Sequence, residues 1–93
     1  MNFESFKTEF KGIMSFYRVK HTFFENGEFG DLNRIEFEYL EKCGTIDFWE
    51  LGWVEIHIIN YDDEKEIFHI LLEPNQEIEM ERAFEILKNI LMR

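Results

Sequence analysis

Apolar residues recur at helical spacing in two stretches, one near each end of the chain. The first stretch follows Asn2, whose side chain is suited to cap a helix, and it predicts a helix over residues 3–16 with a weak point at Gly12. The second follows a potential cap at Asn75 and predicts a helix over residues 76–91. The apolar stripe of this second helix consists of Ile78, Ala83, Phe84, Leu87, Ile90 and Leu91.

Between the two helices, apolar and polar residues alternate, which is the pattern of half-buried strands. The alternation predicts strands at residues 34–40, 45–51, 53–61 and 66–72, and a shorter one at residues 19–24 that turns at Asn26-Gly27. Residues 42–44 and 62–65 are expected to be turns, and Gly52 a bend. Short connections make consecutive strands antiparallel neighbours. The predicted fold is therefore α+β: an antiparallel β-meander of four to five strands with an N-terminal helix and a C-terminal helix.

The segment GTIDFWELGWVEIHIINYDD, residues 44–63, is apolar on both faces of its predicted strands. One face of residues 53–61 carries Val54, Ile56 and Ile58, and the other carries Trp53, Ile59 and Tyr61. Phe68, Ile70 and Leu72 of the last strand are expected to lie beside the second group. A helix covers one face of a sheet, so the other face needs the second helix, a second subunit or a partner.

Composition supports one globular domain, residues 1–93, with more aromatic surface than a small core easily hides. The chain is 45% hydrophobic and 17% aromatic, with eleven phenylalanines. Cys43 is the only cysteine, which excludes an internal disulfide and favours a reducing, cytoplasmic setting. We expect Cys43 to lie in a turn without a catalytic role. The N-terminus lacks a secretory pattern, and no segment reaches the ~20 apolar residues of a membrane span.

Charge is concentrated in the middle of the chain. The formal net charge is −10, and residues 21–81 hold three basic against seventeen acidic residues, whereas each end is +2. Such a field repels nucleic acid and anionic membranes and accelerates encounter with a basic protein. The simpler alternative is that the acidic surface only keeps the protein soluble.

No sequence motif in the chain identifies a catalytic activity. If Tyr61 pairs with Glu66, then His57 and His69 point to opposite sides of the sheet and cannot share a metal; a turn one residue shorter would reverse this. Residues 62–73 place acids like a calcium-binding loop, but Ile67 occupies the position that requires glycine. Paired carboxylates on one strand are explained as well by a solvated polar face as by a catalytic site. The sequence therefore predicts no enzyme, no metal site and no cofactor.

Aromatic residues bordered by carboxylates are typical of a surface that binds a basic protein. The candidate partner-binding residues are Glu36, Glu38, Asp47, Trp49, Trp53, Glu55, Tyr61, Asp62 and Asp63. Small size, an acidic middle, no catalytic motif and the GTIDFWELGWVEIHIINY segment resemble the small cytoplasmic immunity proteins of bacteria, including those of contact-dependent growth inhibition systems.

That resemblance implies a stoichiometric inhibitor. The acidic face of such a protein occupies the basic substrate groove of a toxin domain, commonly a nuclease, or blocks an adjacent exosite. Two other classes stay open. One is a homodimeric structural or regulatory protein, and the other is a small ligand-binding protein or enzyme with a cavity between sheet and helix.

Overall fold

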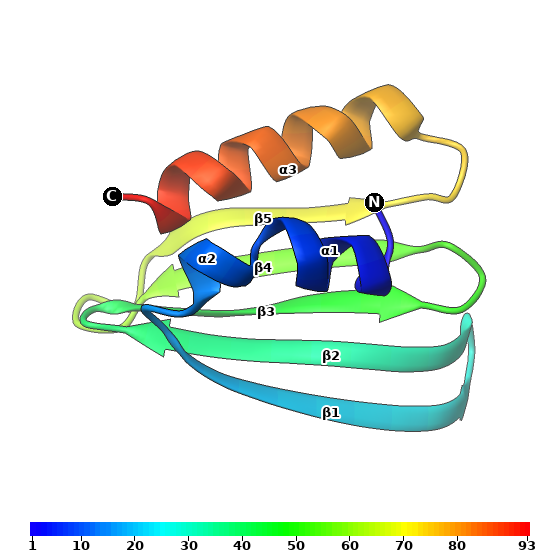
Figure 1. The fold of residues 1–93 in the computed structure, drawn as a ribbon, viewed down its shortest axis with the longest axis horizontal. Helices are drawn as coiled ribbons and strands as arrows, with labels where there is room; N and C mark the ends of the chain where they lie inside the picture. The colour runs from blue at the N-terminus through cyan, green and yellow to red at the C-terminus, as the bar shows by residue number, and fades with distance from the viewer.

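The computed structural model describes all residues, 1–93, and shows an α+β fold with one five-stranded antiparallel sheet. The strands lie in the sheet in chain order, so the sheet is a meander (Figure 1). The elements are α1 (Phe3–Glu9), α2 (Lys11–Met14), β1 (Arg18–Gly27), β2 (Gly30–Tyr39), β3 (Lys42–Trp49), β4 (Val54–Asn60), β5 (Glu66–Leu72) and α3 (Glu77–Leu91). The predicted fold class is confirmed.

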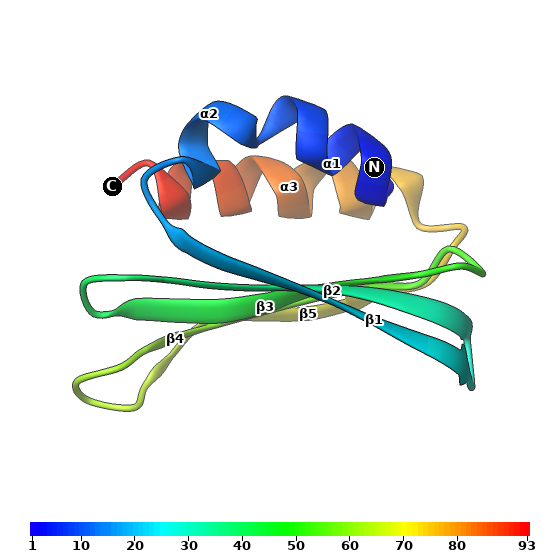
Figure 2. The same ribbon diagram turned by 60° about the horizontal axis from the view of Figure 1, so that its bottom comes forward.

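All three helices lie on the same side of the sheet. Figure 2 shows α1, α2 and α3 as one layer above it, with no element on the opposite side. The alternative in which each helix covers one face is therefore wrong. We call the covered side the helical face, formed by Ile35, Phe37, Ile46, Phe48, Val54, Ile56, Ile58, Phe68, Ile70 and Leu72.

The hydrophobic core fills the layer between the helices and the helical face. Period-two alternation directs every second strand residue into this layer, where seventeen buried residues form one cluster. The stripe of α3 contributes Phe84, Leu87 and Leu91, which are 4%, 0% and 4% exposed, as predicted. Ile78 was predicted in the same stripe but is 62% exposed, and Met80 is buried instead, so the prediction is wrong for the first turn of the helix. From α1, Phe6 stacks on Phe10 and both rings pack near Phe84. β1 contributes no buried residue and forms an exposed edge of the sheet.

Two buried polar side chains hold the C-terminal end of α3. The hydroxyl of Tyr17 donates to the carbonyl of Leu91 at 2.7 Å, and Lys42 Nζ donates to the carbonyls of Ile90 and Arg93 at 2.9 Å. Burial raises the pKa of Tyr17 above its usual value, with smaller contributions from neighbouring acidic groups. A cation at a helix C-terminus satisfies carbonyls that lack an intrahelical partner and complements the helix dipole.

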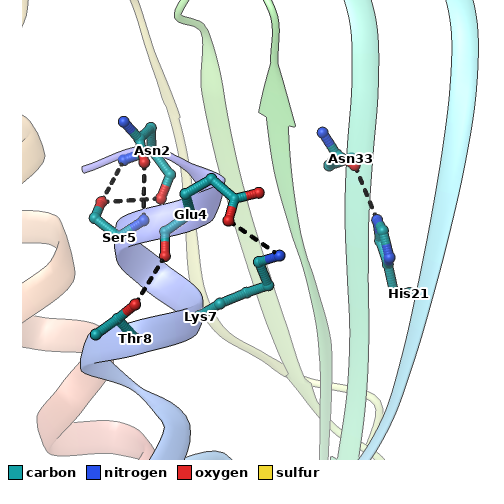
Figure 3. A network of polar contacts seen from close by, with 7 residues as sticks. All are labelled: Asn2, Glu4, Ser5, Lys7, Thr8, His21 and Asn33. Atoms are coloured by element: carbon teal, nitrogen blue, oxygen red, sulfur yellow. Dashed lines mark hydrogen bonds and ion pairs between the residues drawn. The ribbon is translucent and has the colours of Figure 1, made fainter.

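Several element boundaries differ from the prediction. Asn2 caps the first helix as predicted, in a reciprocal pair with Ser5 (Figure 3), but the helix breaks at Phe10 rather than at Gly12. The cap of α3 is Gln76 instead of Asn75.

The turn predicted at residues 42–44 is wrong. These residues begin β3, and the chain reverses at Leu40-Glu41, where Leu40 adopts a φ of 53°. Gly44 lies in the sheet, where it pairs with Phe37 and Ile58. The Phe37 ring and the neighbouring β4 backbone occupy the space that a Cβ would need, so this strand position requires glycine. Cys43 is therefore a half-buried strand residue, not a turn residue.

The predicted pairing of the last two strands is also wrong. Ile59 pairs with Glu66, but Ile58 pairs with Phe68, so Ile67 is an extra residue that forms a bulge in β5. A one-residue bulge exchanges the faces of every residue beyond it. Phe68, Ile70 and Leu72 consequently join the buried residues of β4 on the helical face, rather than the group of Trp53, Ile59 and Tyr61.

The open face of the sheet as a candidate interaction surface

The side of the sheet opposite the helices, which we call the open face, carries most of the polar and charged strand residues. Its register positions are Arg18, Lys20, Thr22, Phe24, Leu32, Arg34, Glu36, Glu38, Cys43, Thr45, Asp47, Trp49, Glu55, His57, Ile59, Glu66, His69 and Leu71. Five of these residues are acidic and three are basic. This face holds five of the nine predicted partner-binding residues: Glu36, Glu38, Asp47, Trp49 and Glu55.

A bidentate ion pair lies at the centre of the open face. Arg34 donates from Nε and Nη2 to the two carboxylate oxygens of Asp47, at 2.8 and 3.0 Å. Asp47 is 3% exposed, and the guanidinium lies 5.3 Å from the centre of the Phe24 ring. The bond to Asp47 is the main cause of a raised Arg34 pKa. Asp47 is therefore engaged within the protein and stabilises the sheet rather than offering a free carboxylate.

An aromatic corner, formed by Phe29, Leu32, Trp49 and Trp53, occupies one end of the open face. The Phe29 ring stacks on Trp53 at 4.3 Å and meets Trp49 edge-on at 5.5 Å. Leu32 pairs with Trp49 across the strands and is buried, yet it lies outside the main core cluster. Both tryptophans are half-buried, so each combines packing with an accessible surface. Phe29 was missed at the sequence level because its segment, between two glycines, shows no periodicity.

The other predicted carboxylates of the open face differ in whether they pair with a residue of this chain. Glu38 is exposed and pairs with Arg18 at 3.2 Å, whereas Glu55 contacts His69 Nε2 at 2.7 Å. Glu36 is half-buried and makes no ion pair within 4.0 Å. It borders a shallow hollow lined by Arg18, Lys20, Glu36, Phe37, Glu38, Cys43, Gly44, Thr45, His57 and Ile59. Glu36 is thus the carboxylate of this face that is best placed to pair with an incoming cation.

Tyr61, Asp62 and Asp63 are separated from the rest of the predicted site. They lie in the connection between β4 and β5, at the end of β4 remote from Trp53 (Figure 1). All three are exposed, Tyr61 by 68%. The structure therefore divides the predicted residues into a strand-face group, the aromatic corner and a distant acidic turn.

The histidines do not follow the sequence-based expectation. His57 and His69 are directly opposite each other on the open face, with ring centres 4.4 Å apart. The prediction that they point to opposite sides is wrong because it did not include the bulge at Ile67. His21 is separate: it lies on β1, its Nε2 is 2.9 Å from Asn33 Oδ1 (Figure 3), and its ring packs near Phe3.

Comparison with known proteins finds no match to any family model, curated sequence or solved structure. None of the helices is both long enough and apolar enough to cross a membrane. The geometry of the open face is therefore the main guide to function.

Proposed function

We propose that this chain is a non-catalytic protein-binding module, and specifically a cytoplasmic immunity protein that binds and neutralises a basic toxin domain. The observation that carries the proposal is the placement of all three helices on one side of the sheet, which leaves the open face without cover (Figure 2). A sheet face of this breadth, with tryptophans at one end and carboxylates along its strands, suits a basic protein partner, because tryptophans anchor interfaces and carboxylates attract a basic surface.

Charge favours a basic protein over other partners. The chain carries −10 overall, and the open face keeps two more acidic than basic residues even though Asp47 and Glu38 are paired internally. Nucleic acid would be repelled by such a field. A basic partner would be attracted to it, and its Lys or Arg side chains would find Glu36 without an internal partner.

Apolar contacts would supply much of the affinity. Phe24 and Leu71 on the open face are 42% and 48% exposed, and Trp49 and Trp53 are half-buried beside them along the sheet. Large side chains held by neighbours lose little entropy on binding, which makes them effective anchors. In this scheme the carboxylates determine the rate of association and the orientation of the partner, and the aromatic corner determines the rate of dissociation.

Self-association through the open face is the second candidate, supported by the same exposed Phe24 and Leu71. A two-fold dimer would place the acidic strands of both copies in one interface, where like charges repel. A small ligand-binding protein or enzyme would need a cavity between sheet and helices. The seventeen-residue core occupies that layer, and the hollow between α1 and the sheet beside Phe48 and Trp53 has a volume of about 240 Å³, below the range of most ligand pockets.

The decisive test is co-expression with the C-terminal domain encoded by the neighbouring gene. Rescue of growth and co-purification in a one-to-one complex are expected when that domain is toxic. If a toxic domain is neither neutralised nor retained, the immunity proposal is wrong. Light scattering of the free protein separates the alternative, since a concentration-dependent dimer would favour self-association.

A further inference from the structure

A cluster of four titratable side chains lies on the open face across β4 and β5, and the interaction proposed above does not require it. The cluster comprises Glu55, His57, Glu66 and His69. Its positions are set by the backbone: His57 and His69 are cross-strand partners, and the bulge at Ile67 brings Glu66 onto the same face. In a regular strand, residues 66 and 69 would point to opposite faces.

Three donor atoms of this cluster converge on one point. Glu66 Oε1 lies 3.0 Å from His57 Nε2 and 3.4 Å from His69 Nδ1. The candidate ligand atoms of these three residues all lie within 4.8 Å of one another. A tetrahedral zinc ion with bonds of about 2.0–2.1 Å holds its donors about 3.3 Å apart. The two separations from Glu66 match this spacing, and the two imidazole nitrogens, which lie within 4.8 Å of each other, would have to approach by up to about 1.5 Å to bind one ion.

Glu55 contacts His69 through the ring nitrogen that does not face Glu66. Its Oε2 is 2.7 Å from His69 Nε2, so a proton on Nε2 is held by the carboxylate and the lone pair of Nδ1 points to the shared centre. A carboxylate that binds the second nitrogen of a ligating histidine is the usual support of a metal site. Because imidazoles bind a metal in their neutral form, a divalent cation would also offset the charges of the two carboxylates that lie together here.

We propose that His57, His69 and Glu66 form a binding site for a borderline divalent cation of the zinc type, with Glu55 as a positioning residue for His69. Two imidazoles and one carboxylate favour zinc, copper, nickel or cobalt over magnesium and calcium, which prefer oxygen ligands alone. The side chains of His57, Glu66 and His69 are 43%, 56% and 40% exposed, so an ion can reach them. Three protein ligands leave a fourth position facing solvent, open to water or to a donor from a partner.

The sequence-based exclusion of a shared metal depended on the register of β4 and β5, and the bulge removes that argument. The competing account is a plain ion-pair network in which protonated histidines contact the two glutamates. The two accounts differ in one measurable respect, which is stoichiometric affinity for a metal ion.

The test is calorimetric titration of the untagged protein with zinc chloride at pH 7.5, because protons compete with the metal for imidazole ligands at lower pH. One site per chain is expected. His57→Gln and His69→Gln should each weaken binding by at least about 100-fold, and Glu55→Gln by about 10- to 100-fold. Matched controls are His21→Gln, which changes the one histidine outside the cluster, and Cys43→Ser; both should stay within about twofold.

A second measurement protects the test against variants that fail to fold. In ¹⁵N spectra of the unmutated protein, zinc should shift the ring nitrogens of His57 and His69 and leave those of His21 in place. Absence of stoichiometric zinc binding, binding that survives both cluster histidine substitutions, or zinc shifts confined to His21 would each overturn the proposal.

Discussion

The two faces of one sheet differ in almost every property although they are built from alternate residues of the same strands. On the helical face, Ile46, Ile56 and Ile58 are completely buried. On the open face, their sequence neighbours include Asp47 and His57, which contact Arg34 and Glu66 across the strands. The core of the helical face is apolar and stabilises the fold, with Lys42 as a buried charged residue at its edge, whereas the open face combines charge, aromatic surface and polar networks.

This difference indicates that the helical face serves the stability of the fold and the open face serves binding. A buried face constrains its residues by volume and apolar contact, so its sequence pattern is set by packing. Residues on a face without cover do not have to fill a packed core, so they can instead be residues that bind a partner or an ion. The exceptions on the open face are Asp47 and Leu32, which are buried there by Arg34 and by the aromatic corner.

The largest expected effect tests whether stability resides on the helical face. Leu87→Ala should lower the free energy of unfolding by about 2–5 kcal/mol, because Leu87 is 0% exposed and a cavity would remain. Leu71→Ala on the open face, where the side chain is 48% exposed, should cost less than about 1 kcal/mol. Urea denaturation of both variants measures the difference, and equal losses would contradict the division between the faces.

The next effect tests whether the aromatic corner holds a partner. Trp49→Ala should weaken the complex by about 2 kcal/mol or more, chiefly through faster dissociation, if this half-buried indole is an anchor. Surface plasmon resonance with the captured toxin domain measures the rates. Because Trp49 also contacts Phe29, thermal melting of the free variant must accompany the assay. A variant that remains folded and dissociates at the original rate would remove Trp49 from the interface.

A third substitution asks how much the open face contributes to stability. Asp47→Asn should cost about 1–3 kcal/mol, because it leaves the Arg34 guanidinium with a weakened partner in a partly buried position. The control is Glu38→Gln, whose partner Arg18 is largely exposed, and there the loss should be below about 1 kcal/mol. Guanidinium denaturation distinguishes the two. A negligible effect of Asp47→Asn would mean that the Arg34–Asp47 ion pair contributes no more to the free energy of unfolding than an exposed ion pair does.

The smallest expected effect is on the rate at which the partner associates. Glu36→Lys should slow association by a few-fold, roughly one decade at most, and the effect should shrink as salt rises. Glu85→Lys makes the same charge change at an exposed position of α3, on the opposite side of the molecule, and should change the rate less. Stopped-flow mixing at several salt concentrations provides the measurement. Equal slowing by both variants would indicate that only net charge steers the partner.

Much of the architecture could be predicted from residue patterns. The period of two marked the strands, with β5 predicted at its observed bounds, and the period near 3.6 marked the buried stripe of α3. These predictions succeed because alternation and helical spacing are local consequences of backbone geometry. For the candidate site, the sequence singled out both tryptophans and the acidic strand residues, but it included the remote turn at Tyr61 and missed Phe29.

Local residue patterns are sufficient to identify the segments that form helices and strands and the residues of each that are apolar. The tertiary structure alone decided that the helices share one face of the sheet, and that the bulge at Ile67 turns His69 toward His57. Neither fact follows from periodicity, because a layer of helices packs wherever the combined apolar surface is best buried. A one-residue bulge, in turn, exchanges the faces of every residue beyond it in β5, and the alternation in the sequence does not mark where the extra residue lies.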